Sequence, residues 1–301
     1  MQNPTQTEDP PWTILSILKW TASYFTSHDI ESPRASAEIL LAYVLGLKRI
    51  DLYIRYDQPL IRDELARFKA TIRRRVRREP VAYIVGEKEF WSLPLAVTPD
   101  VLIPRPETEC LVEAALALLA PAKGEDAGHA VSILELGTGS GALALALAAE
   151  RRTAFIAASD RSEKALAVAR TNARRLGMEE RIHFFLGDWF SCLRSGRACF
   201  DLILSNPPYI PSAEIDGLQP EVSRYEPRAA LDGGADGLSA IRAIIGQASD
   251  YLRPGGHLLL EIGHDQSAAV ESIACGSGAY AEWTFVRDYS GHLRVARIRR
   301  G

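Results

Sequence analysis

Apolar residues recur at helical spacing over residues 12–79. Ile14, Leu18 and Phe25, for example, fall on one stripe. Because an α-helix turns once every 3.6 residues, side chains on such a stripe face a common core. The pattern predicts a small N-terminal helical bundle over residues 1–80.

One helix of this bundle carries clear boundary signals. Ser32 stands where an N-cap is expected, and Pro33 follows at the first helical position. Gly46 is expected to end the same helix, because glycine readily takes the left-handed conformation of a helix terminus.

The pattern changes over residues 81–106. β-branched and aromatic residues alternate there with polar ones, and Gly86, Pro94 and Pro99 interrupt the run. Such alternation with turn residues predicts a hairpin or two short strands. We therefore expect a β-hairpin linker between the bundle and the rest of the chain.

Short apolar runs alternate with helical segments over residues 107–301. The runs are VSILEL, AFIAAS, IHFFLG, FDLILS and GHLLLEIG. Nearly continuous apolar strands between helices indicate a parallel sheet that is covered on both faces. Residues 281–300 hold two further strands without a helix between them, so they predict a terminal hairpin with one antiparallel strand. The fold class is therefore α/β and Rossmann-like.

Composition narrows the possible partners and the compartment. The chain has 301 residues, 24% of them charged, a net charge of -3 and four cysteines without CxxC spacing. This balance predicts no chain-wide basic field and no stable nucleic-acid partner, and the cysteine spacing predicts no metal site. Reduced thiols, a polar N-terminus without a signal core and no long apolar run predict a cytoplasmic protein without membrane contact.

A glycine-rich loop follows the first strand of the α/β region and opens a helix. Gly137, Thr138, Gly139, Ser140 and Gly141 let the backbone approach a ligand closely. The loop also satisfies a loose dinucleotide pattern. Glycine spacing alone therefore leaves S-adenosylmethionine, a nicotinamide cofactor or a ligand-free tight turn as alternatives.

Acidic and aromatic residues follow the next two strands. Asp160, 23 residues after Gly137, can accept both hydroxyls of a ribose. It can equally be a loop acid or a helix cap. Asp188 can accept from an adenine amino group, and Trp189 can lie against the adenine face or pack in the core. In a doubly wound sheet, all these positions meet at the carboxyl edge of the strands.

The fourth strand ends on Asn206, Pro207, Pro208 and Tyr209. An amide or aromatic NH2 group is a poor nucleophile because its lone pair is delocalised. The side-chain carbonyl of Asn206 and the backbone carbonyl of Pro207 can accept its two hydrogens, while the prolines stiffen the loop and Tyr209 stacks on the planar group. With a methyl donor bound at the neighbouring glycine loop, the motif predicts methyl transfer to such a nitrogen; the alternative is an ordinary turn, which Asn-Pro often starts.

Together these motifs resemble the Rossmann-like methyltransferases that act on exocyclic or amide nitrogens, which share a seven-stranded sheet with a reversed last strand. The segments REPVAYIVGEKEFWSLPLAVTPDVLIPRPETE, EPRAALDGGADGLSAIR, YLRPGGHLLLEIG and RDYSGHLRVA resemble the release factor glutamine methyltransferase family, also called PrmC or HemK. The resemblance covers nearly the whole chain beyond about the first ten residues. Arg161 departs from it, because this position is usually aliphatic in the family.

The resemblance implies the cofactor, the substrate and the site. S-adenosylmethionine would be bound by residues 137–141, Asp160, Trp189 and Asn206. The substrate would be the glutamine of the Gly-Gly-Gln motif in peptide-chain release factors 1 and 2, held by residues 206–209 and converted to N(5)-methylglutamine. The helical bundle is expected to bind the release factor. The alternatives are an adenine-N6 methyltransferase on DNA or RNA, a nicotinamide-dependent oxidoreductase and a non-catalytic binding module.

Two further charged segments remain open at the level of sequence. Glu107 and Glu109 fit the first turn of a helix, where carboxylates are favoured, and Arg105 either orients the cofactor or pairs with an acid. The arginine cluster over residues 73–78 is either a solvated helix face or a docking patch for an acidic surface or RNA.

Overall fold

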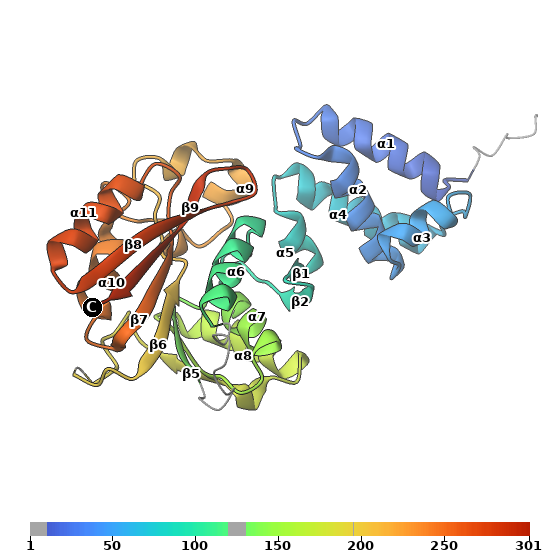
Figure 1. The fold of residues 1–301 in the computed structure, drawn as a ribbon. Coiled ribbons are helices and arrows are strands. Elements are labelled where there is room, and N and C mark those ends of the chain that lie inside the picture. The colour runs from blue at the N-terminus through green and yellow to red at the C-terminus, as the bar shows by residue number, and fades with distance from the viewer. Residues whose placement is uncertain (1–10, 120–130, 195) are drawn as a thin grey trace, which may run out of the picture. The chain divides into compact units, whose positions relative to one another are not determined.

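The structure, a computed structural model, describes residues 11–119, 131–194 and 196–301. It divides into two compact units, of which the first ends at Gly86 and the second begins at Glu87 (Figure 1). The stretch PAKGEDAGHA, residues 121–130, whose composition predicts a loop between a helix and a strand, lies outside the described residues. Within the described residues, no helix is both long and apolar enough to cross a bilayer.

The first unit is the expected helical bundle. Its helices are α1 (Ile14–Thr26), α2 (Pro33–Leu45), α3 (Arg49–Ile54), α4 (Arg62–Val76) and α5 (Val81–Val85). The predicted stripe of Ile14, Leu18 and Phe25 is buried, and it packs with apolar side chains of α2 and α4 in one core. The helical period of the sequence therefore identified this core correctly.

The predicted boundaries of α2 are confirmed, with Ser32 as its N-cap and Gly46 as its C-cap, although the Ser32 backbone is left-handed (φ 48°) and its side chain accepts no capping hydrogen bond. One local prediction in the first unit was wrong. Residues 81–85 form α5 rather than part of a strand, with Tyr83 and Ile84 buried. Burial of these side chains outweighs the weak helix preference of β-branched residues.

The expected hairpin exists, but it is shorter than residues 81–106 and belongs to the second unit. Strands β1 (Glu87–Phe90) and β2 (Leu93–Ala96) pair antiparallel. Phe90 and Leu95 are buried in the core of the second unit. The side chain of Asn172 also holds the backbone of Ala96, accepting from its N–H at 2.7 Å and donating to its carbonyl at 3.0 Å. These contacts make the hairpin a part of the α/β unit rather than a separate linker.

A seven-stranded sheet forms the centre of the second unit. Its strands are β3 (Ser132–Leu136), β4 (Phe155–Asp160), β5 (Ile182–Leu186), β6 (Phe200–Ser205), β7 (Leu252–Glu261), β8 (Tyr280–Arg287) and β9 (Leu293–Arg300). They run in the order β5-β4-β3-β6-β7-β9-β8, and β9 is antiparallel to both of its neighbours. This topology confirms the predicted Rossmann-like sheet with its terminal hairpin.

Helices cover both faces of the sheet (Figure 1). One face packs against α6 (Glu109–Leu118), α7 (Ala142–Glu150) and α8 (Glu163–Arg175), and the other against α10 (Ser239–Ala248) and α11 (Ser267–Ser277). The short elements are α9 (Pro220–Ser223) and the 3-10 turns Pro106–Thr108, Glu179–Arg181, Ile215–Gly217 and Arg228–Ala230. Burial on both faces explains why the central strands β3, β4 and β6 are mostly apolar.

The direction of the strand order reverses at β3, which lies between β4 and β6. Leu136 at the end of β3 is paired with Ser159 on one side and Ser205 on the other. The residues that follow these pairs leave the sheet at one edge. Such a switch point is where open α/β sheets bind ligands.

Candidate active site

The glycine loop, residues 137–141, is held in a left-handed path by its own hydrogen bonds. Gly137, Gly139 and Gly141 have φ angles of 72°, 56° and 84°, which residues with a Cβ atom rarely adopt. The N–H of Gly141 donates to the Thr138 carbonyl at 2.8 Å, and the N–H of Thr138 donates to the Ser159 carbonyl at 2.8 Å. The loop thus arrives at the N-terminus of α7 in a fixed shape.

Asp160 braces this loop from the end of β4. One carboxylate oxygen accepts from the N–H of Gly139 at 2.9 Å and the other from the N–H of Ser162 at 2.8 Å. Ser162 itself caps α8, accepting from the N–H of Ala165 at 3.2 Å. The N-cap of α8 is therefore Ser162 and not Asp160. Each Asp160 oxygen keeps a further lone pair for a ligand.

Glu135 is a site residue that the sequence analysis missed. It lies on β3 and is 2% exposed, and its carboxyl accepts from the Thr138 hydroxyl at 2.7 Å and from the N–H of Ala144 at 3.1 Å. Burial raises the pKa of Glu135 to about 8 despite these two hydrogen bonds. The available signal was a single acid within an otherwise apolar strand.

Asp188 and Trp189 follow β5 at the same edge of the sheet. Asp188 is exposed, while Trp189 is half-buried and has a φ of 49°, a conformation unusual for a large side chain. The Trp189 ring lies beside Gly137 and also packs against the core on the α10 side of the sheet. Its strained backbone places the ring at the rim of the glycine loop.

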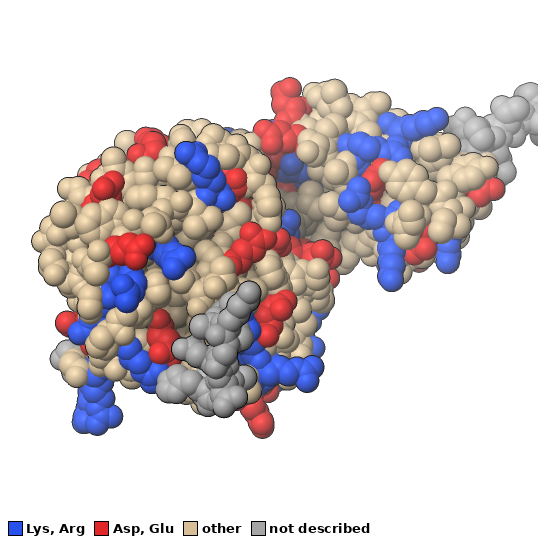
Figure 2. All heavy atoms as spheres, viewed as in Figure 1, with Lys and Arg blue, Asp and Glu red and all other residues tan. Residues whose placement is uncertain are grey.

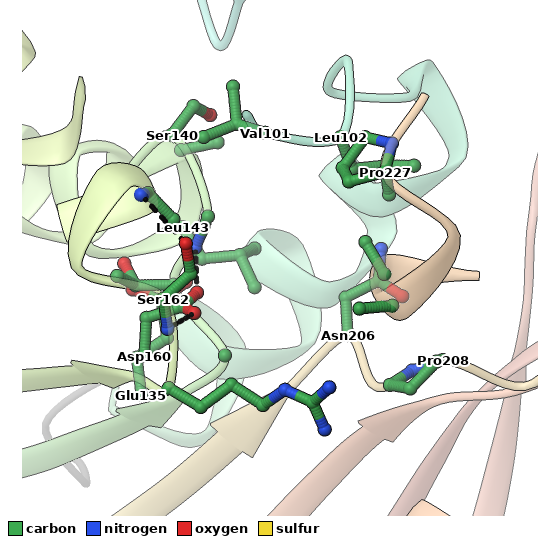
Figure 3. A pocket seen from close by; sticks show the side chains of 18 of the residues that line it. Val101, Leu102, Glu135, Ser140, Leu143, Asp160, Ser162, Asn206, Pro208 and Pro227 are labelled. Atoms are coloured by element: carbon green, nitrogen blue, oxygen red, sulfur yellow. Dashed lines mark hydrogen bonds between the residues drawn. The ribbon is translucent and has the colours of Figure 1, made fainter. Parts of the chain in front are cut away.

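A pocket of about 200 Å³ brings most of these residues together. Its lining includes the predicted residues Gly137, Thr138, Gly139, Ser140, Asp160, Asp188, Trp189, Asn206 and Pro208. Figure 3 shows Asp160, Ser162 and Glu135 gathered on one side of the pocket, and Asn206 and Pro208 on the other. Arg161, the departure from the family pattern, also lines it.

Gly141 does not line this pocket. A Cβ atom added at Gly141 would lie 3.2 Å from the Cβ of Ala169. Its observed role is therefore to let α7 approach α8 closely, as the third glycine of such loops does.

A second pocket of about 190 Å³ adjoins the first. Pro207, Tyr209 and Glu261 line the second pocket together with apolar side chains of the segment 210–231. Asn206 lines both pockets, as do three other residues, namely Leu102, Arg105 and Ala230. Asn206 therefore forms part of the boundary between two cavities.

Hydrogen bonds tie Asn206 and Tyr209 to one buried acid. Asn206 Nδ2 donates to Thr108 Oγ1 at 3.2 Å, and Thr108 Oγ1 donates to Glu261 Oε2 at 2.6 Å. The Tyr209 hydroxyl donates to Glu261 Oε1 at 3.2 Å. Burial, followed by the charge of Glu261, raises the pKa of Tyr209, so the phenol stays protonated at neutral pH.

The segment after Asn206 is fixed by the glycine-rich stretch over residues 233–237. The N–H of Gly233 donates to the Ile210 carbonyl at 2.8 Å, and Gln266 Nε2 donates to the Tyr209 carbonyl at 2.9 Å. A Cβ atom at Gly237 would lie only 2.4 Å from the same Tyr209 carbonyl. The motif at 206–209 is therefore clamped from behind, and only glycine fits at 237.

Arg105 pairs with an acid, which was one of its two expected roles. Its guanidinium lies 2.5 Å from Glu226, whose other oxygen accepts from the N–H of Ile103 at 3.0 Å. Glu107 is exposed in the 3-10 turn before α6. Glu109 begins α6 and accepts from the N–H of Trp91 at 2.8 Å.

The arginine cluster is not uniformly a solvated face. Arg75 is buried and donates to the carbonyl of Glu79 at 3.2 Å, while Arg74 pairs with the Glu79 carboxylate at 2.5 Å. Arg73 and Arg77 are exposed. At least two of these arginines therefore organise the turn that follows α4.

Comparison with known proteins places both units in one family. A family profile described as PrmC N-terminal domain matches residues 16–86, and one described as Methyltransferase domain matches residues 128–285. A release factor glutamine methyltransferase of Geobacter sulfurreducens is 44% identical over 296 residues, which is 98% of this chain and 100% of that protein. Those of Caulobacter vibrioides and Chlorobaculum tepidum are each 42% identical over 285 residues, 94% of this chain and 96% of the relative.

Solved structures share the fold at lower identity. The hMettl16 catalytic domain in complex with MAT2A 3'UTR hairpin 6 is 15% identical with a TM-score of 0.55, covering 70% of this chain and 76% of that one. Human methyltransferase 10 domain containing protein is 14% identical with a TM-score of 0.52, covering 70% and 89%. At these identities the likeness concerns the fold alone.

These comparisons decide the cofactor that glycine spacing left open. The methyltransferase profile and the full-length relatives favour S-adenosylmethionine over a nicotinamide cofactor. The sheet topology, the glycine loop and similarity over nearly the whole chain agree. The chain belongs to the release factor glutamine methyltransferase family and is an S-adenosylmethionine-dependent protein-glutamine methyltransferase.

Proposed function

We propose that this protein methylates the side-chain amide nitrogen of the glutamine in the Gly-Gly-Gln motif of peptide-chain release factors 1 and 2, in the cytoplasm. The observation that carries the proposal is the hydrogen bonding of the Asn206 side chain, which lies between the two pockets. Its amide nitrogen is committed to Thr108, whereas its amide oxygen accepts no hydrogen bond from the described residues. An acceptor in this position suits a primary amide that must be held by its hydrogens.

The first pocket fits S-adenosylmethionine. Asp160 offers carboxylate lone pairs for the ribose hydroxyls, and Asp188 and Trp189 offer an acceptor and an aromatic face for the adenine. At the loop 137–141 the glycine backbone can come close to the cofactor. Val101, Leu102 and Leu143 form apolar walls of the pocket. When bound there, the cofactor supplies an electrophilic methyl group carried on a sulfonium. Asn206 would lie beside that methyl group.

The second pocket fits the substrate glutamine. Asn206 Oδ1 and the Pro207 carbonyl would accept the two amide hydrogens and fix the plane of the group. Tyr209, with its hydroxyl tied to Glu261, would stack on that plane. Because the raised pKa of Tyr209 keeps the phenol neutral, the site offers no phenolate base, and the proton is lost after methyl transfer.

The N-terminal unit fits a protein partner. Its exposed large apolar side chains are Trp12, Trp20, Tyr43, Ile50, Tyr53, Ile54, Tyr56 and Ile61. Exposed apolar groups gathered on a small unit are typical of protein interaction surfaces. On the face drawn in Figure 2, both acidic and basic side chains lie among large neutral areas. We infer that this unit binds the release factor.

Labelled methyl transfer tests the proposal. Purified release factor is incubated with the enzyme and radiolabelled S-adenosylmethionine, beside a release factor whose motif glutamine is replaced by alanine. We expect label in the first protein only. Equal labelling of both would refute the substrate, and transfer to an adenine-containing DNA or RNA oligonucleotide instead would favour the adenine alternative.

A further inference from the structure

Thr108 and Glu261 form a buried pair next to the proposed acceptor. They are 4% and 1% exposed and lie 153 positions apart in the sequence, Thr108 before α6 and Glu261 at the end of β7. Nothing in the local sequence around either residue indicates a partner. The 2.6 Å hydrogen bond between them is therefore a product of the tertiary structure.

The hydroxyl of Thr108 has a single hydrogen, and that hydrogen is donated to Glu261. Toward Asn206, Thr108 can then only accept. The Asn206 side chain must consequently present its NH2 group to Thr108, and its oxygen points the opposite way. A flipped amide would face Thr108 with its oxygen, where no hydrogen remains to be donated, and would offer the substrate amide two donors in place of an acceptor.

Glu261 can fill this role because both of its oxygens act as acceptors. Oε2 accepts from Thr108 and Oε1 accepts from the Tyr209 hydroxyl, so one carboxyl orients both ends of the motif. Arg294 lies nearby and donates to the carbonyl of Ile262 at 3.2 Å and to Asp288 at 3.2 Å. Burial raises the pKa of Glu261 above its usual value, while the hydrogen bond from Thr108 and the positive charge of Arg294 act in the opposite direction and favour the ionised carboxylate.

We propose that Thr108 and Glu261 are positioning residues that fix the amide orientation of Asn206, so that its oxygen and not its nitrogen faces the substrate. This proposal rests on the proposed function, because the orientation of Asn206 matters only if its oxygen accepts a hydrogen bond from the amide that is methylated. Thr108 lines the first pocket and Glu261 the second, and the role assigned to both is to act through Asn206 and Tyr209.

Matched variants separate orientation from packing. Thr108→Val keeps the volume and removes the hydroxyl, whereas Thr108→Ser keeps the hydroxyl and removes a methyl group. For Thr108→Val we expect kcat on release factor to fall about 10- to 100-fold, with KM and the Kd for S-adenosylhomocysteine within about threefold of wild type. Thr108→Ser should retain kcat within about threefold of wild type.

Glu261→Gln provides a second test if Thr108→Val does not fold. The glutamine is isosteric but offers one acceptor and one NH2 group, so it cannot accept from both Thr108 and Tyr209. We expect kcat to fall at least about tenfold with cofactor affinity retained.

The outcomes distinguish failure of the proposed function from failure of the positioning role given to Thr108 and Glu261. Wild-type enzyme that transfers no methyl group to the release factor glutamine would overturn the proposed function and this inference with it. Active wild-type enzyme together with a Thr108→Val variant of near-normal kcat, or with a Thr108→Ser variant as impaired as Thr108→Val, would overturn the inference alone.

Discussion

The two units of the protein place apolar and acidic side chains in opposite ways. The first unit has less than a third of the chain, yet it carries eight of the twelve exposed large hydrophobic residues among those that the structure describes. The second unit holds four of the five buried acids among the described residues, and two of these, Glu135 and Glu261, line its pockets. A buried carboxylate costs free energy unless hydrogen bonds satisfy it. A large exposed apolar surface is unfavourable in water unless a partner covers it.

This difference separates two kinds of recognition. A small cofactor and a single side chain require an enclosed site in which every donor and acceptor is oriented, and buried acids provide that orientation. A folded protein substrate requires an accessible apolar surface instead. Four substitutions, in order of decreasing expected effect, test whether chemistry and docking are divided between the units in this way.

Asn206→Ala should have the largest effect. Removing the acceptor between the two pockets should lower kcat by about 10²- to 10³-fold, the usual cost of losing one oriented hydrogen-bonding group in the transition state. Binding of S-adenosylhomocysteine, measured by calorimetry, should stay within about threefold of wild type. A near-normal kcat would show that the reaction does not need the Asn206 acceptor, and it would contradict the assignment of the chemistry to this site in the second unit.

Asp160→Ala should mainly affect the cofactor. The variant loses the acceptors proposed for the ribose and also the brace on Gly139, which together should weaken S-adenosylhomocysteine binding about 10- to 100-fold. Asp188→Ala on the same rim is the matched control, and because Asp188 is exposed we expect only about a threefold loss. Equal losses in the two variants would contradict the role given to Asp160.

Ile54→Asp tests docking on the first unit. Ile54 is 69% exposed, so an aspartate should leave the melting temperature unchanged while raising the KM for intact release factor about tenfold. A short peptide carrying the Gly-Gly-Gln motif should be methylated with unchanged kcat/KM. Phe155→Asp, at an exposed apolar position of the second unit, is the control and should leave both KM values unchanged.

Glu38→Gln should have the smallest effect, because it alters the one buried acid described in the first unit. Glu38 is hydrogen-bonded to Arg34, Arg49 and Tyr53 at 2.5, 2.7 and 2.5 Å. Burial raises its pKa, but the hydrogen bonds from Arg49, Tyr53 and Arg34 together outweigh burial and lower it to about 2. We expect the variant to lose about 1–2 kcal/mol of unfolding free energy at pH 7.

The pH dependence of that loss follows from the direction of the shift. A carboxyl whose pKa is lower in the folded state stabilises the fold above its unfolded pKa, and this contribution disappears as the pH falls toward about 2. Denaturant melts of wild type and Glu38→Gln should therefore converge between pH 4.5 and 2. A difference that stays constant over this range would mean that Glu38 acts through packing alone.

Local sequence was sufficient for most of the elements and for several residues that line the first pocket. Period-3.6 stripes identified the bundle core, and apolar runs identified the parallel strands, because these periods follow directly from backbone geometry. The residues after the strand ends were also predictable, since the carboxyl ends of parallel strands meet at one edge of the sheet. Gly137, Asp160 and Asn206 therefore line one pocket, as expected.

What the sequence alone determined is thus most of the elements, the order of the motifs and the family. The tertiary structure decided which unit holds the hairpin at 87–96, that residues 81–85 are helical, and that Glu135, Thr108 and Glu261 line the pockets. These features depend on burial and on hydrogen bonds between groups such as Thr108 and Glu261 that are remote in the chain. Local propensity carries no information about such partners, because only packing brings them within hydrogen-bonding distance.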